Sequence, residues 1–230
     1  MFVVLFDLEG TLVQSVENDH KAVQEFRSKT RKKLLELGIP SDELRNLTRS
    51  TLLRNKAREY VESHFSKKEA RRFHDEMNMF VKRYELCWAD HSQIFPDTFQ
   101  ALDKLRNLGC KMGIVTNTSK EAANRMLLTH GISDFFDVVV TREDVKRLKP
   151  DPEGILVALK KLAAQDFFFV GDLVHDSQAA KKAYGVAITV NRNPSNKSKF
   201  ASDYAVRSLL EIPRLVQRKA CASRIQGSAI

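Results

Sequence analysis

The chain has 230 residues, of which 43% are hydrophobic and 29% charged, and its formal net charge is +9. That length suits one large domain or a domain with a smaller one inserted and is enough to bury a core, and the composition is ordinary for a soluble globular protein. No apolar run approaches the roughly 20 residues of a membrane helix, and the short N-terminal apolar stretch lacks the basic leader of a signal peptide. Three cysteines, odd in number and widely spaced, indicate no disulfide framework. We therefore predict a cytoplasmic location.

The positive charge is concentrated towards the C-terminal end. From Arg192 onward the chain carries eight basic and two acidic residues. Such an excess can attract an anionic substrate or nucleic acid, or it can be a solvated surface. The segment lacks the interleaved aromatic and basic residues that bind single-stranded nucleic acid. We therefore favour a solvated surface and expect no nucleic-acid partner and no membrane partner.

The first elements predicted along the chain are one strand and then a block of helices. Residues 2–6 are continuously apolar and end in polar residues, which is typical of a central strand. Helix-compatible apolar spacing follows over 19–37 and 41–64, and a third helix opens at the capping-box sequence SKKE and runs towards residue 89. Residues 15–92 are therefore predicted to form an all-helical block.

From residue 97 on, helices and strands alternate. The predicted helices cover residues 97–108, 118–131, 152–163 and 177–184, and the predicted strands 111–116, 138–140, 167–170 and 186–190. This alternation indicates an α/β fold with a parallel sheet, because parallel strands need crossover helices. The sequence beyond about residue 217 is weakly patterned, so the basic tail, residues 216–230, is expected to be disordered.

Polar residues follow the predicted strands where those strands end. They are Asp7, Glu9, Thr116, Asn117, Lys149, Asp172 and Asp176. The carboxyl ends of parallel strands lie at one edge of a sheet, where α/β proteins bind ligands. Carboxylates so close together repel unless a cation neutralises them, and an oxygen-only ligand set suits Mg²⁺. Hydroxyl groups and a lysine nearby suit a phosphoryl group.

Four short sequences at these strand ends resemble the ordered motifs of the haloacid dehalogenase-like (HAD) hydrolase superfamily. They are DLEGT at 7–11, IVTNTS at 114–119, KPDP at 149–152 and GDLVHD at 171–176. The resemblance implies a three-layer, Rossmann-like parallel sheet core formed by residues 1–14 and 93–215. It also implies that the helical block, residues 15–92, is the cap domain that this family inserts after its first strand.

By this resemblance Asp7 is the nucleophile and forms an aspartyl-phosphate. Glu9 is the general acid and base, and its backbone carbonyl binds Mg²⁺ together with the carboxylates of Asp7 and Asp172. Lys149 balances charge between the nucleophile and the phosphoryl group.

The resemblance gives three further residues supporting roles. Thr116 and Asn117, with Lys149, bind the phosphoryl group. Asp176 acts one shell further from the metal, through water or by holding Lys149. The function that follows is a Mg²⁺-dependent phosphatase for a small phosphorylated metabolite, acting as a monomer or a homodimer.

Glu9 departs from the family pattern, in which most phosphatases carry Asp at this position. Dehalogenases carry an aromatic residue there, because a departing halide needs no proton, so Glu9 argues against a dehalogenase. Enolase-phosphatases of the superfamily carry a similar glutamate, which is compatible with phosphatase activity. A phosphomutase, a dehalogenase and a catalytically impaired phosphate-binding module remain alternatives.

Several of these residues also have ordinary structural interpretations. Thr118 is expected to cap the helix that follows it, and Asp176 could be the N-cap of a helix from Ser177. We expect His175 to be a loop residue and not a ligand. In the helical block, a group of basic residues could face an anionic substrate, although a solvated helix face is favoured: Arg45, Arg49, Arg54 and Lys56.

Overall fold

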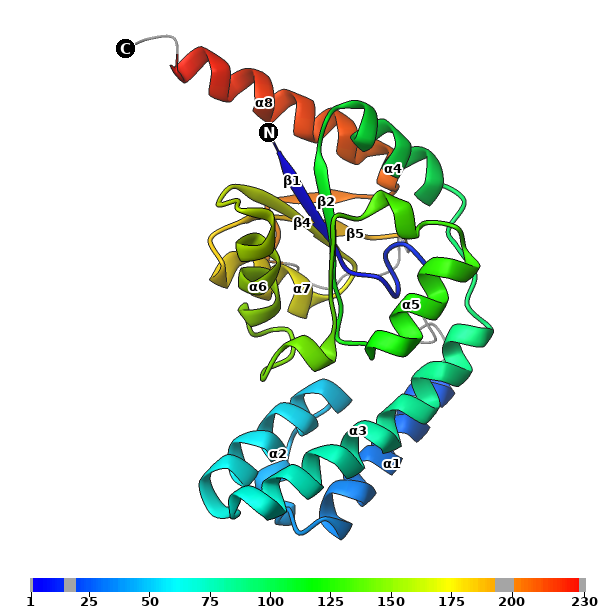
Figure 1. Cartoon of the computed structure of the whole chain (residues 1–230), viewed down its shortest axis with the longest axis vertical. Helices are drawn as coiled ribbons and strands as arrows, with labels where there is room; N and C mark the ends of the chain where they lie inside the picture. The colour runs from blue at the N-terminus through cyan, green and yellow to red at the C-terminus, as the bar shows by residue number, and fades with distance from the viewer. Residues whose placement is uncertain (1, 15–19, 193–200, 228–230) are drawn as a thin grey trace. The chain divides into compact units, whose positions relative to one another are not determined.

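The computed structural model describes residues 2–14, 20–192 and 201–227 of the chain (Figure 1). Two compact units are present, one made of Met1–Ser15 with Ser92–Ile230 and the other of Val16–His91. We call them the sheet unit and the helical unit. Ser15 and the predicted helix start at Asp19 lie outside the described residues.

The sheet unit is built on six parallel strands in the order β3-β2-β1-β4-β5-β6. The strands are β1 (Val3–Phe6), β2 (Lys111–Val115), β3 (Val138–Val140), β4 (Phe167–Gly171), β5 (Val186–Val190) and β6 (Tyr204–Val206). Strand β1 is central, and its Val3 lies opposite Lys111 of β2 and Phe167 of β4. All four β1 residues are buried, which explains why this strand is continuously apolar.

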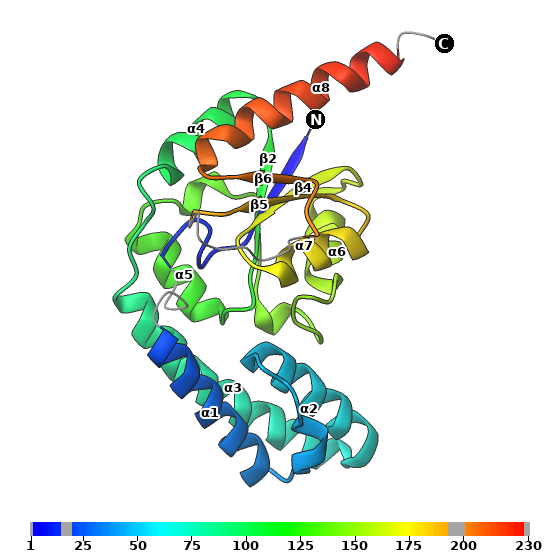
Figure 2. The same ribbon diagram turned by 180° about the vertical axis from the view of Figure 1, so that it is seen from behind.

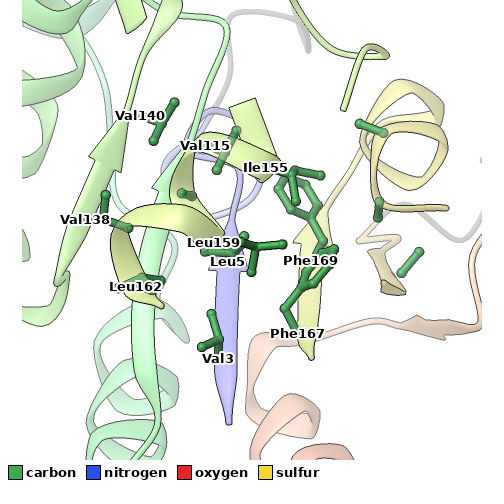
Figure 3. Packing of buried hydrophobic residues seen from close by; sticks show 14 residues of the cluster. Val3, Leu5, Val115, Val138, Val140, Ile155, Leu159, Leu162, Phe167 and Phe169 are labelled. Atoms are coloured by element: carbon green, nitrogen blue, oxygen red, sulfur yellow. The ribbon is translucent and has the colours of Figure 1, made fainter. Parts of the chain in front are cut away.

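Helices cover both faces of the sheet (Figures 1 and 2). They are α4 (Thr98–Asn107), α5 (Lys120–Thr129) and α8 (Ile212–Gly227) on one face, and α6 (Glu153–Leu162) and α7 (Val174–Lys182) on the other. On the α6 side, Val3 and Leu5 pack with Leu159 and Phe169 in one apolar cluster (Figure 3). This arrangement confirms the predicted three-layer, Rossmann-like α/β fold.

The helical unit contains α1 (His20–Glu36), α2 (Ser50–His64) and α3 (Lys67–Asp90), with a short 3₁₀ helix, η2 (Ser41–Leu44). Its core includes an aromatic group in which the Phe26 ring lies 4.9 Å from the Trp88 ring and 5.1 Å from the Tyr84 ring. Helix α3 begins at the predicted capping box, since the Glu69 backbone N–H donates to Ser66 Oγ and the Ser66 N–H donates back to the Glu69 carboxylate.

Two elements near the C-terminus were not predicted from the sequence. Strand β6 is short and two of its three residues are exposed, so it lacks a strong apolar signal. Helix α8 covers Ile212–Gly227, including most of the segment expected to be a disordered tail. Its Ile212 and Val216 are buried, which anchors the start of the helix. Among the described residues, no helix has the length and apolar character needed to cross a bilayer.

Candidate functional site

The parallel register brings the polar residues of the sequence motifs to one edge of the sheet. Asp7 follows β1, and its N–H donates to the Val170 carbonyl of β4 at 2.9 Å. Thr116 follows β2, and its N–H donates to the Val140 carbonyl of β3 at 3.0 Å. The polar residue after each of these two strands thus still takes part in the interstrand hydrogen bonds. This fixes the direction in which its side chain leaves the sheet.

Lys149 forms the centre of a buried charge cluster. Its Nζ lies 2.7 Å from Asp7 Oδ1 and 2.7 Å from Asp176 Oδ1. The three residues are 2%, 6% and 1% exposed, respectively. At such burial each charge is stable only because it is paired, so removing one partner leaves an uncompensated charge in the interior.

Burial and the shared lysine set the protonation of this cluster. Burial raises the pKa of Asp7 to about 7, with Lys149 opposing the rise and Asp176 adding to it. Burial also opposes ionisation of Asp176, but Lys149 and His175 outweigh it and hold the pKa of Asp176 below its usual value. Burial would lower the pKa of Lys149, yet the two carboxylates raise it, so the lysine stays charged.

A third carboxylate completes an acidic group beside this cluster. Asp7, Asp172 and Asp176 each offer an oxygen, and these oxygens all lie within 4.8 Å of one another. Thr11 Oγ1 donates to Asp172 Oδ1 at 3.1 Å, which orients that side chain. An oxygen-only donor set of this size fits a hard divalent cation such as Mg²⁺.

Two glycines leave room for these carboxylates. Gly10 has φ +81°, and a Cβ there would lie 2.3 Å from Asp172 Oδ2. A Cβ at Gly171 would lie 2.4 Å from the Cβ of Asp176. Both distances are far shorter than a real contact, so any larger residue would displace the acidic side chains.

Glu9 is not a member of the three-carboxylate group found among the described residues. Its carboxylate accepts a hydrogen bond from Thr118 Oγ1. The Thr118 N–H in turn donates to Thr116 Oγ1 at 3.2 Å. Glu9 is therefore tied to the loop after β2.

Asn117 is bonded to the backbone of the lysine loop. Its Nδ2 donates to the Lys149 carbonyl at 3.2 Å, and its Oδ1 accepts from the Lys149 N–H at 2.9 Å. Both ends of the amide are thus used to hold Lys149. The four motifs predict a substrate contact for Asn117, but they give no signal for its contact to the Lys149 backbone. The side chain of Thr116 is buried at the same edge of the sheet.

Three structural interpretations of site residues were wrong. Ser119, not Thr118, is the N-cap of α5. Asp176 is not an N-cap, because α7 begins at Val174 and the Asp176 carboxylate accepts the Leu173 N–H at 3.0 Å from within the first turn. His175 is not a loop residue, since it is buried in that turn with its Nε2 3.6 Å from Asp176 Oδ1.

The contact of Thr11 with Asp172 and the contact of Thr118 with Glu9 were not predicted from the sequence, which indicated only a capping role for Thr118. Thr11 ends the first motif, so the signal available for it was a hydroxyl two residues after a candidate acid. Thr118 had no such signal, because its partner Glu9 lies 109 residues away in the sequence.

The basic residues singled out in the helical unit have acidic neighbours there. Arg45 Nη2 lies 2.6 Å from Asp42 Oδ1, and Lys56 Nζ lies 3.1 Å from Glu43 Oε2. Arg49 and Arg54 also take part in polar or electrostatic interactions. A contact of these four residues with an anionic substrate therefore stays a prediction.

Comparison with known proteins points to the family that the four motifs resemble, and the matches extend over most of the chain. The family model described as haloacid dehalogenase-like hydrolase matches residues 4–190. Pyrophosphatase PpaX of Bacillus velezensis is 31% identical over 225 residues, which are 91% of this chain and 93% of the relative. Phosphoglycolate phosphatase of Chromobacterium violaceum is 26% identical over 219 residues, covering 93% of this chain and 96% of the relative.

A solved structure agrees with this comparison. The crystal structure of a HAD phosphatase from Thermococcus onnurineus superposes with a TM-score of 0.59 at 28% identity, covering 94% of this chain and 98% of that one. The resemblance found in the four motifs is thereby confirmed. The chain belongs to the haloacid dehalogenase-like hydrolases.

Proposed function

We propose that the chain is a Mg²⁺-dependent phosphatase that hydrolyses a small phosphorylated metabolite through a phosphorylated Asp7. The observation that carries this proposal is the buried Lys149 between Asp7 and Asp176, with Asp172 beside them. Burying several charges together costs free energy, so a cluster of this kind indicates a function that requires it. The relatives named pyrophosphatase and phosphoglycolate phosphatase support the same class of substrate.

The first step is attack by an Asp7 carboxylate oxygen on phosphorus. The new O–P bond forms as the bond from phosphorus to the leaving oxygen breaks, and that oxygen takes the proton of Glu9. Lys149, 2.7 Å from Asp7 Oδ1, orients the nucleophile and offsets charge on the phosphoryl oxygens.

The second step releases phosphate. Glu9, now a carboxylate, takes a proton from a water molecule whose oxygen attacks phosphorus, and the bond from phosphorus to Asp7 breaks. Glu9 is thereby protonated again and Asp7 is returned as a carboxylate. Both steps need the Glu9 carboxyl group at the same side of the phosphoryl group.

The carboxylates of Asp7 and Asp172, with the Glu9 backbone carbonyl, would hold Mg²⁺. When bound, the ion would neutralise these carboxylates and the phosphoryl oxygens and favour the ionised form of Asp7. Asp176 already accepts from the Leu173 N–H and pairs with Lys149, so we assign it the positioning of Lys149 and not a place on the metal.

The remaining predicted roles complete the proposal. Thr116 binds the phosphoryl group. Asn117 binds the same group through its backbone N–H, while its side chain fixes the Lys149 backbone. The helical unit acts as the cap that selects the substrate. A cytoplasmic location fits the free Cys87 and Cys110.

The test is release of inorganic phosphate from p-nitrophenyl phosphate and from a panel of phosphorylated metabolites, with Mg²⁺ and with EDTA. We expect Mg²⁺-dependent turnover that Asp7→Asn abolishes. Asp166→Asn is the matched control, because exposed Asp166 precedes β4 at the end of the sheet away from Asp172.

The other outcomes identify the alternatives. Full turnover by Asp7→Asn would refute the covalent scheme. An isomerised sugar phosphate in place of free phosphate would indicate a phosphomutase, and halide release would indicate a dehalogenase. No phosphate release from any substrate of the panel, with binding of phosphate retained, would indicate a binding module.

A further inference from the structure

We infer that Thr118 is the positioning residue for the Glu9 carboxyl group, and that the length of a glutamate side chain at position 9 is matched to it. This inference rests on the proposed function, since it assigns a support to the proton donor of that scheme. Thr118 is 4% exposed, and its Oγ1 donates to Glu9 Oε2. Glu9 is half-buried. A hydrogen bond to a carboxylate is stronger than one between neutral groups, and burial of the Thr118 donor strengthens it further.

The Thr118 hydroxyl is itself held rigidly. Its N–H donates to Thr116 Oγ1 at 3.2 Å, and its carbonyl accepts the Arg142 N–H at 3.1 Å. The backbone on both sides of the side chain is therefore fixed, to the residue after β2 on one side and to the segment after β3 on the other. A β-branched side chain on a fixed backbone has few rotamers, so the hydroxyl has a defined position.

The residue type at position 9 follows from this contact. An aspartate would place its carboxylate one methylene, about 1.5 Å, closer to the backbone and out of reach of a hydroxyl that cannot follow it. A misplacement of about 1 Å can cost on the order of 100-fold in rate. Aspartate at position 9 would therefore be a poorer acid in this chain than glutamate is.

The experiment compares kcat/KM for two substrates that differ in their need for a proton. p-Nitrophenolate leaves without one, whereas the alkoxide of glycerol 2-phosphate requires one. We expect Thr118→Val to lower kcat/KM for glycerol 2-phosphate by about 10- to 100-fold and for p-nitrophenyl phosphate by less than about threefold. Thr118→Ser, which keeps the hydroxyl, recovers most of the loss.

Two further variants test whether the two residues act as a unit. In a Glu9→Gln background, Thr118→Val should change kcat/KM for glycerol 2-phosphate by less than about twofold, because the group it positions is gone. Glu9→Asp should show the same substrate-dependent loss as Thr118→Val. Thr129→Val, at the exposed far end of α5, is the matched control. Thr118→Ala replaces Thr118→Val if the valine variant does not give a wild-type circular dichroism spectrum.

An equal loss for both substrates, additive effects in the Glu9→Gln background, or a gain of rate in Glu9→Asp would overturn the inference while leaving the phosphatase itself established. Wild-type protein that hydrolyses neither substrate nor any metabolite of the panel, or an active Asp7→Asn, would overturn the proposed function, and the positioning role with it.

Discussion

In the sheet unit, the Lys149 side chain is 2% exposed and pairs with two carboxylates, whereas in the helical unit the Arg72 side chain is 83% exposed and pairs with Glu76 one helical turn away. The core of the helical unit is mainly apolar and aromatic, with Glu85 as its one buried charged residue among those described, and its ion pairs lie largely on the surface. The sheet unit instead buries a charged cluster at the edge of its sheet. Buried pairs are costly to break and exposed pairs contribute little, so the two units should respond very differently to the loss of one charge.

The largest effect is expected for Lys149→Met. It leaves Asp7 and Asp176 buried without their cation, so we expect the free energy of unfolding to fall by about 3 to 5 kcal/mol and phosphatase activity to be lost. Urea denaturation followed by far-UV circular dichroism measures the change. Lys161→Met, on the exposed side of α6, is the control and should be near neutral. Equal stability of the two variants would mean that the buried cluster contributes nothing to the fold.

The apolar core of the helical unit should give the next largest effect. Phe26→Ala removes a ring 4.9 Å from Trp88 and 5.1 Å from Tyr84, and should destabilise this unit by about 3 kcal/mol. Trp88 is the single tryptophan of the chain, so its fluorescence reports the unfolding of the helical unit alone. Met79→Ala, at a 57% exposed position of α3, should change the same transition by less than about 0.5 kcal/mol. If the two variants shift it equally, the aromatic group is not the stabilising core.

A partly buried charge should lie between these extremes. Asp97 Oδ2 accepts hydrogen bonds from Arg192 Nη1, Ser208 Oγ and the Leu209 N–H at 2.6–2.9 Å. Burial opposes ionisation, but these donors outweigh it and lower the pKa of Asp97. A carboxyl group whose pKa is lower in the folded state stabilises the fold above its unfolded pKa and loses this contribution as the pH falls through the folded pKa.

Asp97→Asn should therefore cost about 1 to 3 kcal/mol at pH 7, and the difference from wild type should shrink below about pH 4. Urea unfolding at a series of pH values measures this, with Asp103→Asn on the exposed side of α4 as control. A difference that stays constant down to pH 3 would show that the charge of Asp97 plays no part.

The smallest effect is expected at the surface of the helical unit. Arg72→Ala should change the free energy of unfolding by less than about 0.5 kcal/mol, because the guanidinium is solvated and its pair with Glu76 is screened. The Trp88 fluorescence transition, measured in low and in high salt, checks this. A loss comparable to that of Lys149→Met would remove the contrast between the two units.

The sequence was a good guide wherever the determinant was local or repeated. Continuous apolar runs predicted β1 and β4, and the alternation of helices and strands predicted a parallel sheet. Because the fold then places the carboxyl ends of the strands together, it was possible to expect that Asp7, Asp172 and Asp176 lie close to one another. The structure places an oxygen of each within 4.8 Å of the others.

The sequence was a poor guide where a distant partner decides what a side chain does. Thr118 has a residue type that suits a helix cap, but a carboxylate 109 residues away takes its hydroxyl. Asp176 also suits a cap, but from inside the first turn of α7 it both accepts the Leu173 N–H and meets Lys149. Strand β6 is mostly exposed, so no apolar pattern in the sequence signals its pairing with β5, which the backbone makes.

The central place of β1 has a consequence for the order of events during synthesis. This strand precedes both of its neighbours, Lys111–Val115 and Phe167–Gly171, which leave the ribosome only after the whole helical unit has been made. The apolar segment VVLF therefore has no partner strand during this time, while the local helices can already form. An unpaired apolar strand is prone to aggregation, and binding of a chaperone to this segment would protect the strand that Asp7 follows.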